Sequence, residues 1–352
     1  MVSHRCNARV GLLGNPSDGY FGKTLAFTLR DLYAEVCLEP SDTLQILPHP
    51  VHDGLQAPSL ACLVTSLHQY GFGGGVRLLQ AICCRFLTHC NEAGIKLPEK
   101  GPFSLKYDTN IPRASGLAGS SAIVCAAFNC LLDYFEVRER ISIQDRPGII
   151  LAAEEDLNIV AGLQDRVAQV YGGLVYMDFG EQHMKQSGRG RYTPLDAALL
   201  PQLLVVVANS PSDSGKVHSD VRERWKRGDP AVHQGMAAIA ALAEEGRREL
   251  ERRDLEALGR SMDANFELRR QIFGDKVIGK ANLKMVEVAR HHGGSAKLCG
   301  SGGAVVVWLA NSKGMEQPFR AACSREGWDV YAAMPGAASA EVNGNQGAPG
   351  CP

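Results

Sequence analysis

A run rich in glycine, serine and alanine, Pro112–Ala122, joins a short predicted strand, Phe103–Tyr107, to a strongly helical segment, Ser120–Phe135. Small residues let the backbone approach a ligand closely, and the start of a helix presents unpaired N–H groups with partial positive charge. Phosphate is the natural occupant of such a loop. Ser120 and Ser121 are placed to cap the helix, and either offers a hydroxyl to a phosphate-bound Mg²⁺. The run lacks the Gly-Lys-Ser/Thr of a Walker loop, and an ordinary serine-capped core helix remains the alternative.

A second glycine run, Lys297–Gly303, lies between a predicted amphipathic helix, Asn282–His291, and a predicted strand, Ala304–Trp308. Three glycines among residues 300–303 indicate either a backbone in close contact with another group or simply a tight turn before the strand. Two such loops in one chain suggest two walls of a single phosphate site.

Two acidic residues, Glu154 and Asp165, follow the first loop. Phosphoryl transfer to a hydroxyl uses Mg²⁺ to offset charge and can use a carboxylate to take the proton. Most acidic residues are solvated surface, and that is the default for both. Asp165 departs from it, because Gly162-Leu163-Gln164 before it and Val167-Ala168 after it predict a half-buried helix start.

The chain opens with a predicted strand over residues 8–14 and a turn over residues 15–19. A cation on the strand, Arg9, is suited to stabilise a substrate alkoxide and the transferring phosphoryl group. Asp18 in the turn is suited to accept hydrogen bonds from sugar hydroxyls, although it also fits a turn-capping aspartate.

The remaining elements predict a two-domain α+β protein. A polar segment, Gln182–Tyr192, is interpreted as a loop and as the region of the domain boundary. The expected division is 1–195, 196–335 and a disordered tail over 336–352, which is rich in Gly, Ala and Pro. The other predicted strands are Leu25–Leu38, Gly172–Phe179 and Leu203–Ala208, and the other predicted helices are Arg77–His89, one that begins over Ile149–Glu155, and a helical block over Ala231–Phe273.

Composition excludes several classes of partner. A length of 352 residues exceeds one comfortable core, and the net charge of −1 gives no global attraction to nucleic acid or to an anionic membrane. No apolar run approaches the ~18 residues of a membrane span.

The eleven cysteines form no C-x-x-C pair, which indicates a reducing compartment, most simply the cytoplasm. We expect a monomer or a weak homodimer.

The opening segment 8–18, Pro112–Ala122 and Lys297–Gly303 occur in the order of the three motifs of the GHMP superfamily of small-molecule kinases, and the chain resembles that family over most of residues 8–335. The resemblance implies a two-domain GHMP kinase fold with the active site between the domains, and ATP and Mg²⁺ as cofactors. It also implies that Asp165 is the catalytic aspartate and that Arg9 lies near the transferred phosphoryl group. Asp18 matches the acceptor of sugar hydroxyls, and Ser121 and Glu154 match the Mg²⁺ ligands. The residues that match the ATP phosphate loop are Ser115, Gly116, Leu117, Ala118, Gly119, Ser120 and Ser121.

Within the superfamily the chain is most similar to plant-type glucuronokinases, over segments 9–18, 107–113, 162–173 and 212–219. Asn15-Pro16 stands where galactokinases carry Glu-His, which removes a carboxylate from the sugar site and favours an anionic sugar. The resemblance implies transfer of the ATP γ-phosphoryl group to the C1 hydroxyl of D-glucuronate. It leaves open galacturonate, galactose, a heptose phosphate, a mevalonate-pathway substrate, or a non-catalytic sensor. The candidates for binding the uronate carboxylate are Lys23, Arg113, Lys216 and Arg269.

Overall fold

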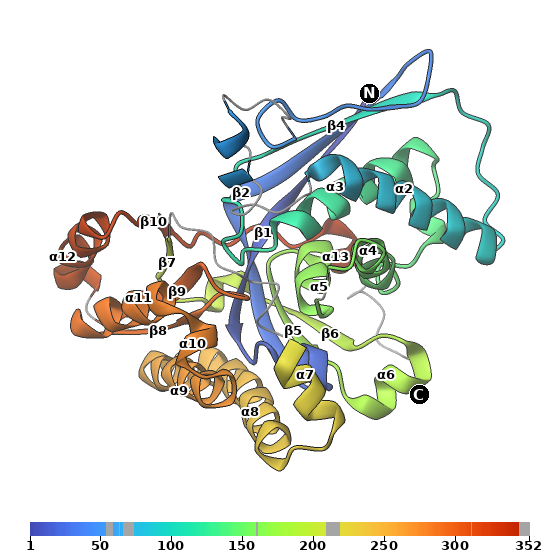
Figure 1. The fold of residues 1–352 in the computed structure, drawn as a ribbon. Coiled ribbons are helices and arrows are strands. Elements are labelled where there is room, and N and C mark those ends of the chain that lie inside the picture. The colour runs from blue at the N-terminus through green and yellow to red at the C-terminus, as the bar shows by residue number, and fades with distance from the viewer. Residues whose placement is uncertain are drawn as a thin grey trace. The chain divides into compact units, whose positions relative to one another are not determined.

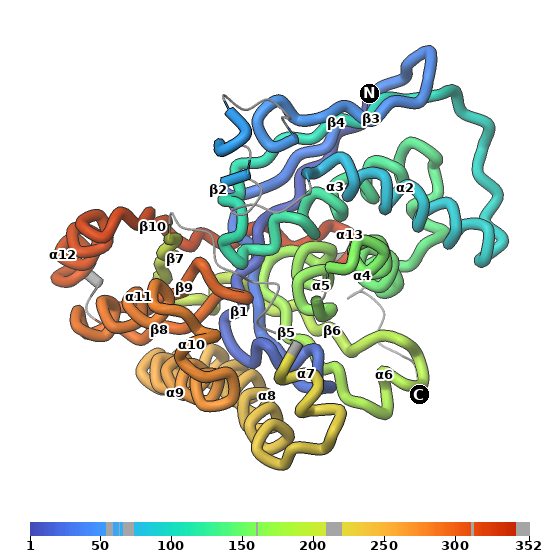
Figure 2. Tube along the Cα trace, in the orientation of Figure 1, coloured from blue at the N-terminus to red at the C-terminus, as the bar shows by residue number. Residues whose placement is uncertain are grey.

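The computed structural model describes residues 1–53, 59–62, 64–65, 74–159, 161–208, 219–310 and 312–344. Helices and strands are mixed along the chain, which confirms the predicted α+β class (Figures 1 and 2). The strands are Val2–Leu13 (β1), Lys23–Pro40 (β2), Gln45–Ile46 (β3), Phe103–Thr109 (β4), Leu174–Asp178 (β5), Arg191–Leu195 (β6), Leu203–Val207 (β7), Gly294–Leu298 (β8), Ala304–Leu309 (β9) and Asp329–Ala332 (β10). The α-helices are Gly75–Glu92 (α2), Gly119–Tyr134 (α3), Arg146–Glu155 (α4), Gln164–Tyr171 (α5), Glu181–Ser187 (α6), Ser219–Lys226 (α7), Pro230–Arg252 (α8), Leu255–Phe273 (α9), Asp275–Ile278 (α10), Lys280–His291 (α11), Ser312–Arg325 (α12) and Ala340–Gly344 (α13). The 3₁₀ helices are Ser17–Tyr20 (η1), Arg138–Arg140 (η2) and Ala197–Leu199 (η3).

The chain divides into two compact units that interleave along the sequence. Unit 1 comprises Met1–Ala8, Leu32–Arg113 and Ala118–Val170, and unit 2 comprises Arg9–Asp31, Ala114–Leu117 and Tyr171–Pro352. This division differs from the contiguous one expected near residue 195, because the long strands β1 and β2 contribute residues to both units. How the chain divides into folding domains remains a prediction.

Unit 1 contains the second half of β2, which pairs antiparallel with β4 from Ala34↔Thr109 to Pro40↔Phe103. β3 adds to β4 in parallel. Helices α2, α3 and α4 contact one another. Helix α3 is almost entirely buried from Ser121 to Leu132, as expected of a helix that is apolar on every side.

Unit 2 contains the first half of β2, paired antiparallel with β5 from Lys23↔Asp178 to Phe27↔Leu174, and β6 adds to β5. A second sheet has the order β10-β7-β9-β8, with all neighbours antiparallel. Alternate residues of three of its strands point to one face, as the period of two requires, and pack against apolar side chains of the helices. These core residues are Leu204, Val206, Ala296, Leu298, Val305 and Val307 from the strands, and Met236, Ile239, Phe266, Met285, Val286 and Phe319 from the helices.

Two expectations from the sequence are corrected. Gln182–Tyr192 is not a loop, because it contains most of α6 and the start of β6. An ion pair between Lys185 and Glu181, four residues apart, joins successive turns of this polar helix, and Gly188 ends it in a left-handed conformation. The tail is ordered to residue 344, because Gly336 and Ser339 donate backbone hydrogen bonds to Thr28 (2.8 Å) and Tyr171 (2.7 Å) before α13 begins. Residues 345–352 lie outside the described part.

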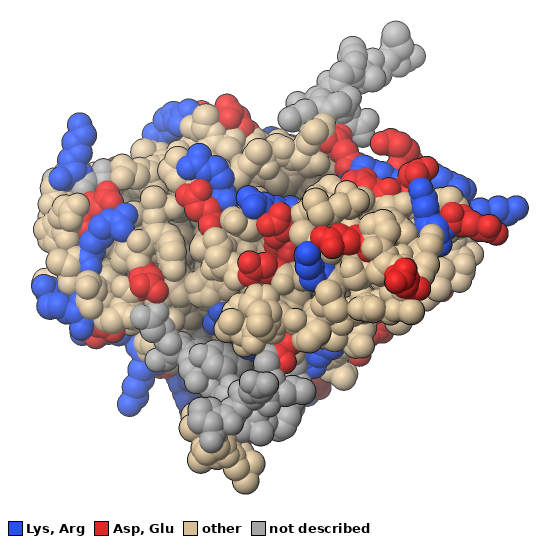
Figure 3. All heavy atoms as spheres, turned by 90° about the horizontal axis from the view of Figure 1, so that it is seen from above, with Lys and Arg blue, Asp and Glu red and all other residues tan. Residues whose placement is uncertain are grey.

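Basic and acidic side chains alternate over the face drawn in Figure 3, in keeping with the net charge of −1. Within the described residues, no helix has the length and apolar character needed to cross a membrane.

Candidate active site

The small-residue loop ends where helix α3 begins, at Gly119. Its N-cap residue, Ala118, is left-handed (φ 63°), and no side chain of the described residues caps the helix. The expectation that Ser120 or Ser121 caps α3 is therefore wrong: both lie inside the first turn, past the capping position. The Ser121 hydroxyl instead donates to the carbonyl oxygen of Ala118 (3.2 Å). A helix start without a side-chain cap leaves its N–H groups to a ligand or to water.

The backbone of the same loop alternates in hand. Ala114 (φ 53°), Gly116 (φ 69°) and Ala118 (φ 63°) are left-handed, whereas Ser115 and Leu117 are not. Alternation of this kind turns successive N–H groups toward one side and forms a concave anion site. The loop therefore has the backbone form of an anion site, without the lysine of a Walker loop.

In unit 2 the loop 114–117 packs against the second glycine run. A Cβ atom added to Gly116 would lie 2.5 Å from the carbonyl oxygen of Gly302, and one added to Gly303 would lie 2.7 Å from that of Ala114. Backbone meets backbone at both points, so only glycine fits. The two loops predicted to share a site do lie together.

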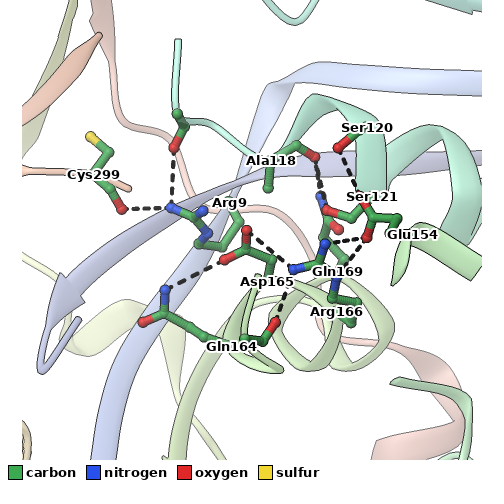
Figure 4. Close-up of polar contacts among 12 residues, drawn as sticks. Arg9, Ala118, Ser120, Ser121, Glu154, Gln164, Asp165, Arg166, Gln169 and Cys299 are labelled. Atoms are coloured by element: carbon green, nitrogen blue, oxygen red, sulfur yellow. Dashed lines mark hydrogen bonds and ion pairs between the residues drawn. The ribbon is translucent and has the colours of Figure 1, made fainter. Parts of the chain in front are cut away.

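Arg9 on β1 joins the two loops and is 3% exposed. Its Nη1 donates to the carbonyl oxygens of Cys299 (2.5 Å) and Gly116 (3.3 Å), as the dashed lines in Figure 4 show. Its backbone N–H donates to the carbonyl oxygen of Leu117 (3.0 Å). Backbone acceptors of both loops thus hold the guanidinium beside the phosphate loop.

Two further buried cations lie in unit 2; the sequence assigned no role to the side chain of the first, whereas the second is one of the candidates for binding the uronate carboxylate. Lys297 is 1% exposed, and its ammonium donates to Gly11 O (2.8 Å), Asn15 Oδ1 (2.5 Å) and Leu298 O (2.9 Å). Burial, with Arg269 and Arg9 nearby, lowers the pKa of Lys297 well below its usual range.

The second is Arg269 on α9, which is 2% exposed and donates through Nη1 to the carbonyl oxygen of Gly300 (2.7 Å). Burial first, and then the charge of Arg9, lowers the pKa of its guanidinium to about 10. Its Nε and Nη2 have no hydrogen-bond partner in the described part of the chain.

Unit 1 gathers the predicted acidic residues around Arg166, which the sequence did not single out. Glu154 is completely buried; its Oε1 accepts from the Ser120 hydroxyl (2.8 Å) and its Oε2 accepts from Nε of Arg166 (2.7 Å) and also from Nη2 (Figure 4). Asp165 lies in the first turn of α5 with its side chain 21% exposed. One of its oxygens is 3.6 Å from Nη1 of Arg166, and Gln164 donates to the other at 3.5 Å. The predicted half-buried helix start is confirmed.

The donor chemistry for Mg²⁺ is present, because the Ser121 hydroxyl and the Glu154 carboxylate are hard oxygen ligands. Arg166 already neutralises Glu154, so an ion at this carboxylate has to compete with the guanidinium. The described residues contain no group of three or more His, Cys, Asp or Glu side chains arranged to hold a metal. Magnesium sites at nucleotides often use one or two carboxylates and complete the shell with phosphate oxygens and water.

The other predicted binding residues are distributed over both units. Asp18 is in η1. Lys23 is paired with Glu244 (2.6 Å) and lies 3.8 Å from Asp178. In unit 1, Arg113 donates to the carbonyl oxygen of His52 (3.4 Å). The predicted Lys216 lies outside the described residues.

Comparisons with known proteins agree with these features. Residues 78–173 match the family description "GHMP kinases N terminal domain", and residues 247–325 match "GHMP kinases C terminal". The chain is 52% identical to Glucuronokinase 1 of Arabidopsis thaliana over 329 residues, which cover 94% of this chain and 91% of that protein. It is 54% identical to Probable glucuronokinase 2 of the same plant, over 94% of this chain and 90% of that protein.

Solved structures share the fold at low identity. A Lin0012 protein from Listeria innocua has a TM-score of 0.72 and 16% identity, covering 96% of this chain and 97% of that one. Lactococcus lactis galactokinase complexed with galactose has a TM-score of 0.71 and 15% identity, covering 96% and 95%. These structures support the architecture.

Proposed function

The chain belongs to the GHMP kinases, and from this membership we propose that it transfers the γ-phosphoryl group of ATP to the C1 hydroxyl of D-glucuronate. One geometric observation carries the kinase chemistry: the left-handed alternation of residues 114–118, which leads into the uncapped start of α3. The glucuronokinases at 52–54% identity over nearly the whole chain support glucuronate as the acceptor.

The proposed phosphate site is made mainly of backbone. The N–H groups of Ser115–Ser121 wrap the phosphates of ATP, and the guanidinium of Arg9 offsets the charge that develops during transfer. Arg9 suits this task because backbone carbonyl oxygens of Gly116 and Cys299 hold its guanidinium beside the loop. Ser121 and Glu154 are the residues that would hold Mg²⁺, which would offset the negative charge of the phosphates.

Asp165 is the proposed catalytic residue. Its carboxylate orients the C1 hydroxyl for in-line attack and accepts its proton as the new bond to phosphorus forms. The side chain is partly exposed and lies in the first turn of α5, which supports this role. Asp18 is proposed to accept hydrogen bonds from other sugar hydroxyls.

The ten cysteines that the structure describes are all free, which supports the proposal of a reducing, cytoplasmic location. A monomeric or weakly dimeric state, and independence of nucleic acid and membrane, remain predictions.

Initial rates of ADP release with a panel of acceptors test the function. The panel contains D-glucuronate, D-galacturonate, D-galactose, a heptose phosphate and mevalonate, each with MgATP. We expect the highest kcat/KM for D-glucuronate. Preference for a neutral hexose or for mevalonate overturns the assigned substrate, and ATP binding without turnover of any acceptor indicates a sensor.

A further inference from the structure

The four cationic residues that are candidates for binding the uronate carboxylate differ in their interactions with the rest of the chain. The ammonium of Lys23 is already compensated by Glu244 at 2.6 Å. Arg113 belongs to unit 1, where it donates to the backbone of His52, and Lys216 lies outside the described residues. Arg269 differs from these because its guanidinium is buried and, among the described residues, no carboxylate lies within ion-pair distance of it.

Such a charge is costly to bury without a counter-ion. The cost is increased by the charge of Arg9, which is also almost fully buried. Lys297, which is more buried than Arg269, interacts with it electrostatically as well. A fold that maintains this arrangement is organised for an anion.

The two guanidinium cations both donate to the second glycine run, at Cys299 and Gly300, but differ in their other neighbours. Arg9 contacts the phosphate loop through the carbonyl oxygen of Gly116. Besides Arg9 and Lys297, the ionisable neighbours of Arg269 include Tyr20 and Asp18, both in η1. Because Asp18 is the proposed acceptor of sugar hydroxyls, Arg269 belongs to the sugar end of the site and Arg9 to the phosphate end.

The atoms of Arg269 that lack partners also fit a carboxylate. Its Nη1 is occupied by the carbonyl oxygen of Gly300, whereas Nε and Nη2 have no partner in the described residues. These two nitrogens direct N–H bonds to the same side of the planar guanidinium, and this pair engages both oxygens of a carboxylate at once.

We propose that Nε and Nη2 of Arg269 bind the two carboxylate oxygens of the uronate, and that this pairing makes the enzyme prefer a sugar acid to a neutral sugar. The inference rests on the glucuronate kinase function proposed above. It selects one residue from the four candidates and gives it a role in specificity.

The test compares kcat/KM for D-glucuronate and for D-glucuronamide, its neutral isostere, in the wild type, Arg269→Gln, Arg269→Lys and Arg270→Gln. Arg270 is a matched control, because it is the next residue on α9, exposed, and paired with Asp275 at 2.8 Å. We expect Arg269→Gln to lower kcat/KM for glucuronate about 30-fold or more, the usual cost of removing one partner of a buried charge pair, and to change glucuronamide only a few-fold. Arg270→Gln should retain the wild-type ratio.

Arg269→Lys keeps the charge and can still donate to Gly300, so it covers the case in which the glutamine variant does not fold. A single ammonium cannot make the paired contact, so the ratio of glucuronate to glucuronamide should still fall about tenfold. An equal loss of kcat/KM for both substrates overturns the inference and assigns Arg269 to the support of residues 300–303. A higher KM for ATP with an unchanged KM for glucuronate also overturns it and assigns Arg269 to the phosphates. A wild-type enzyme inactive on glucuronate overturns the proposed function itself, whereas an active wild type with an unchanged ratio in both Arg269 variants overturns the inference alone.

Discussion

The side chain of Asp165 is the residue on which the proposed chemistry depends. Converting it to asparagine removes the proton acceptor but keeps the size and much of the hydrogen bonding, so kcat should fall by about 100-fold or more. The free energy of unfolding should change by less than about 1 kcal/mol, because the side chain is partly exposed. Steady-state kinetics and urea unfolding check both expectations. Glu155→Gln, an exposed neighbour of Glu154, is the control and should keep the wild-type rate.

A kcat for Asp165→Asn within a few-fold of the wild type would remove Asp165 from the reaction. It would leave the fold and the phosphate loop as described.

The buried pair of Glu154 and Arg166 gives a prediction about stability. Arg166→Met leaves a completely buried carboxylate without its cation, and such changes cost about 3–5 kcal/mol. Adding Glu154→Gln removes the unpaired charge, so the double variant should recover part of that loss. Urea unfolding of the two single variants and the double variant measures the coupling. If Arg166→Met is as stable as the wild type, the pair does not hold α4 and α5 together.

At this scale the sequence predicts the surroundings of Asp165 but not the buried cations. Flanking apolar residues indicated that Asp165 begins a half-buried helix, and the structure agrees. The burial of Arg166, Arg269 and Lys297 was not predictable, because each depends on acceptors that the chain brings close only on folding. Lys297, for example, donates to Gly11, which precedes it by 286 positions.

Among the structural elements, the contact between the two glycine loops is tested at Gly116. Gly116 has a left-handed φ of 69°, and the Cβ of an alanine at this position would meet the carbonyl oxygen of Gly302. Gly188 has the same φ, but an added Cβ there would have nothing within 4 Å. Gly188→Ala should therefore cost about 1 kcal/mol of stability from backbone strain alone. Gly116→Ala should lower stability by about 1–3 kcal/mol more than Gly188→Ala does, because of overpacking. It should also raise the KM for ATP about tenfold or more by displacing the loop. Thermal unfolding and ATP kinetics give both values, and equal effects of the two changes would contradict this packing.

A second prediction concerns β2, β5 and helix α8, which meet at Glu244. Its Oε2 accepts hydrogen bonds from the ammonium of Lys23 (2.6 Å) and the hydroxyl of Tyr176 (2.7 Å). Chiefly through Lys23, these bonds lower the pKa of Glu244 from 4.5 to about 2. Because the folded pKa lies below the unfolded one, the contribution to stability is complete above pH 4.5 and is lost as the pH falls toward 2.

Glu244→Gln should thus lower stability at neutral pH by on the order of 1 kcal/mol, a modest value for a side chain that is 32% exposed, and should flatten the decline between pH 5 and 3. Denaturant unfolding across this range is the measurement. Glu251→Gln, which removes an exposed partner of Arg247 on the same helix, should follow the wild-type profile. An identical pH profile for Glu244→Gln would show that Glu244 does not make this contribution.

Elements with strong apolar periodicity were predictable, and polar ones were not. Most predicted strands and helices agree with the structure to within a few residues, but β1 begins at Val2, well before residue 8. The helix expected to begin over Ile149–Glu155 instead ends there as α4, and the predicted helical block Ala231–Phe273 is two helices, α8 and α9. Helix α6 and strand β6 were missed because a local ion pair and pairing with the edge of β5 stabilise them without apolar patterning. The serine-cap prediction at α3 failed because a left-handed alanine, a conformation that residue type does not reveal, occupies the N-cap.

At the scale of the whole molecule, the mixed class and the family were predictable because three loop motifs occur in a fixed order. The interleaved units were not, since that division depends on strand pairs such as β2 with β4 and β2 with β5, which join segments far apart in sequence. The matches to both halves of the GHMP kinases and the similar solved structures support the architecture as a whole.

The product formed from D-glucuronate and MgATP is the most direct evidence to obtain. Proton-coupled ³¹P NMR of the reaction mixture shows which sugar carbon carries the phosphate. We predict a single new phosphate ester, coupled to the anomeric proton, that accumulates in step with ADP. An ester at another position, or ADP release without any sugar phosphate, would contradict the proposed function.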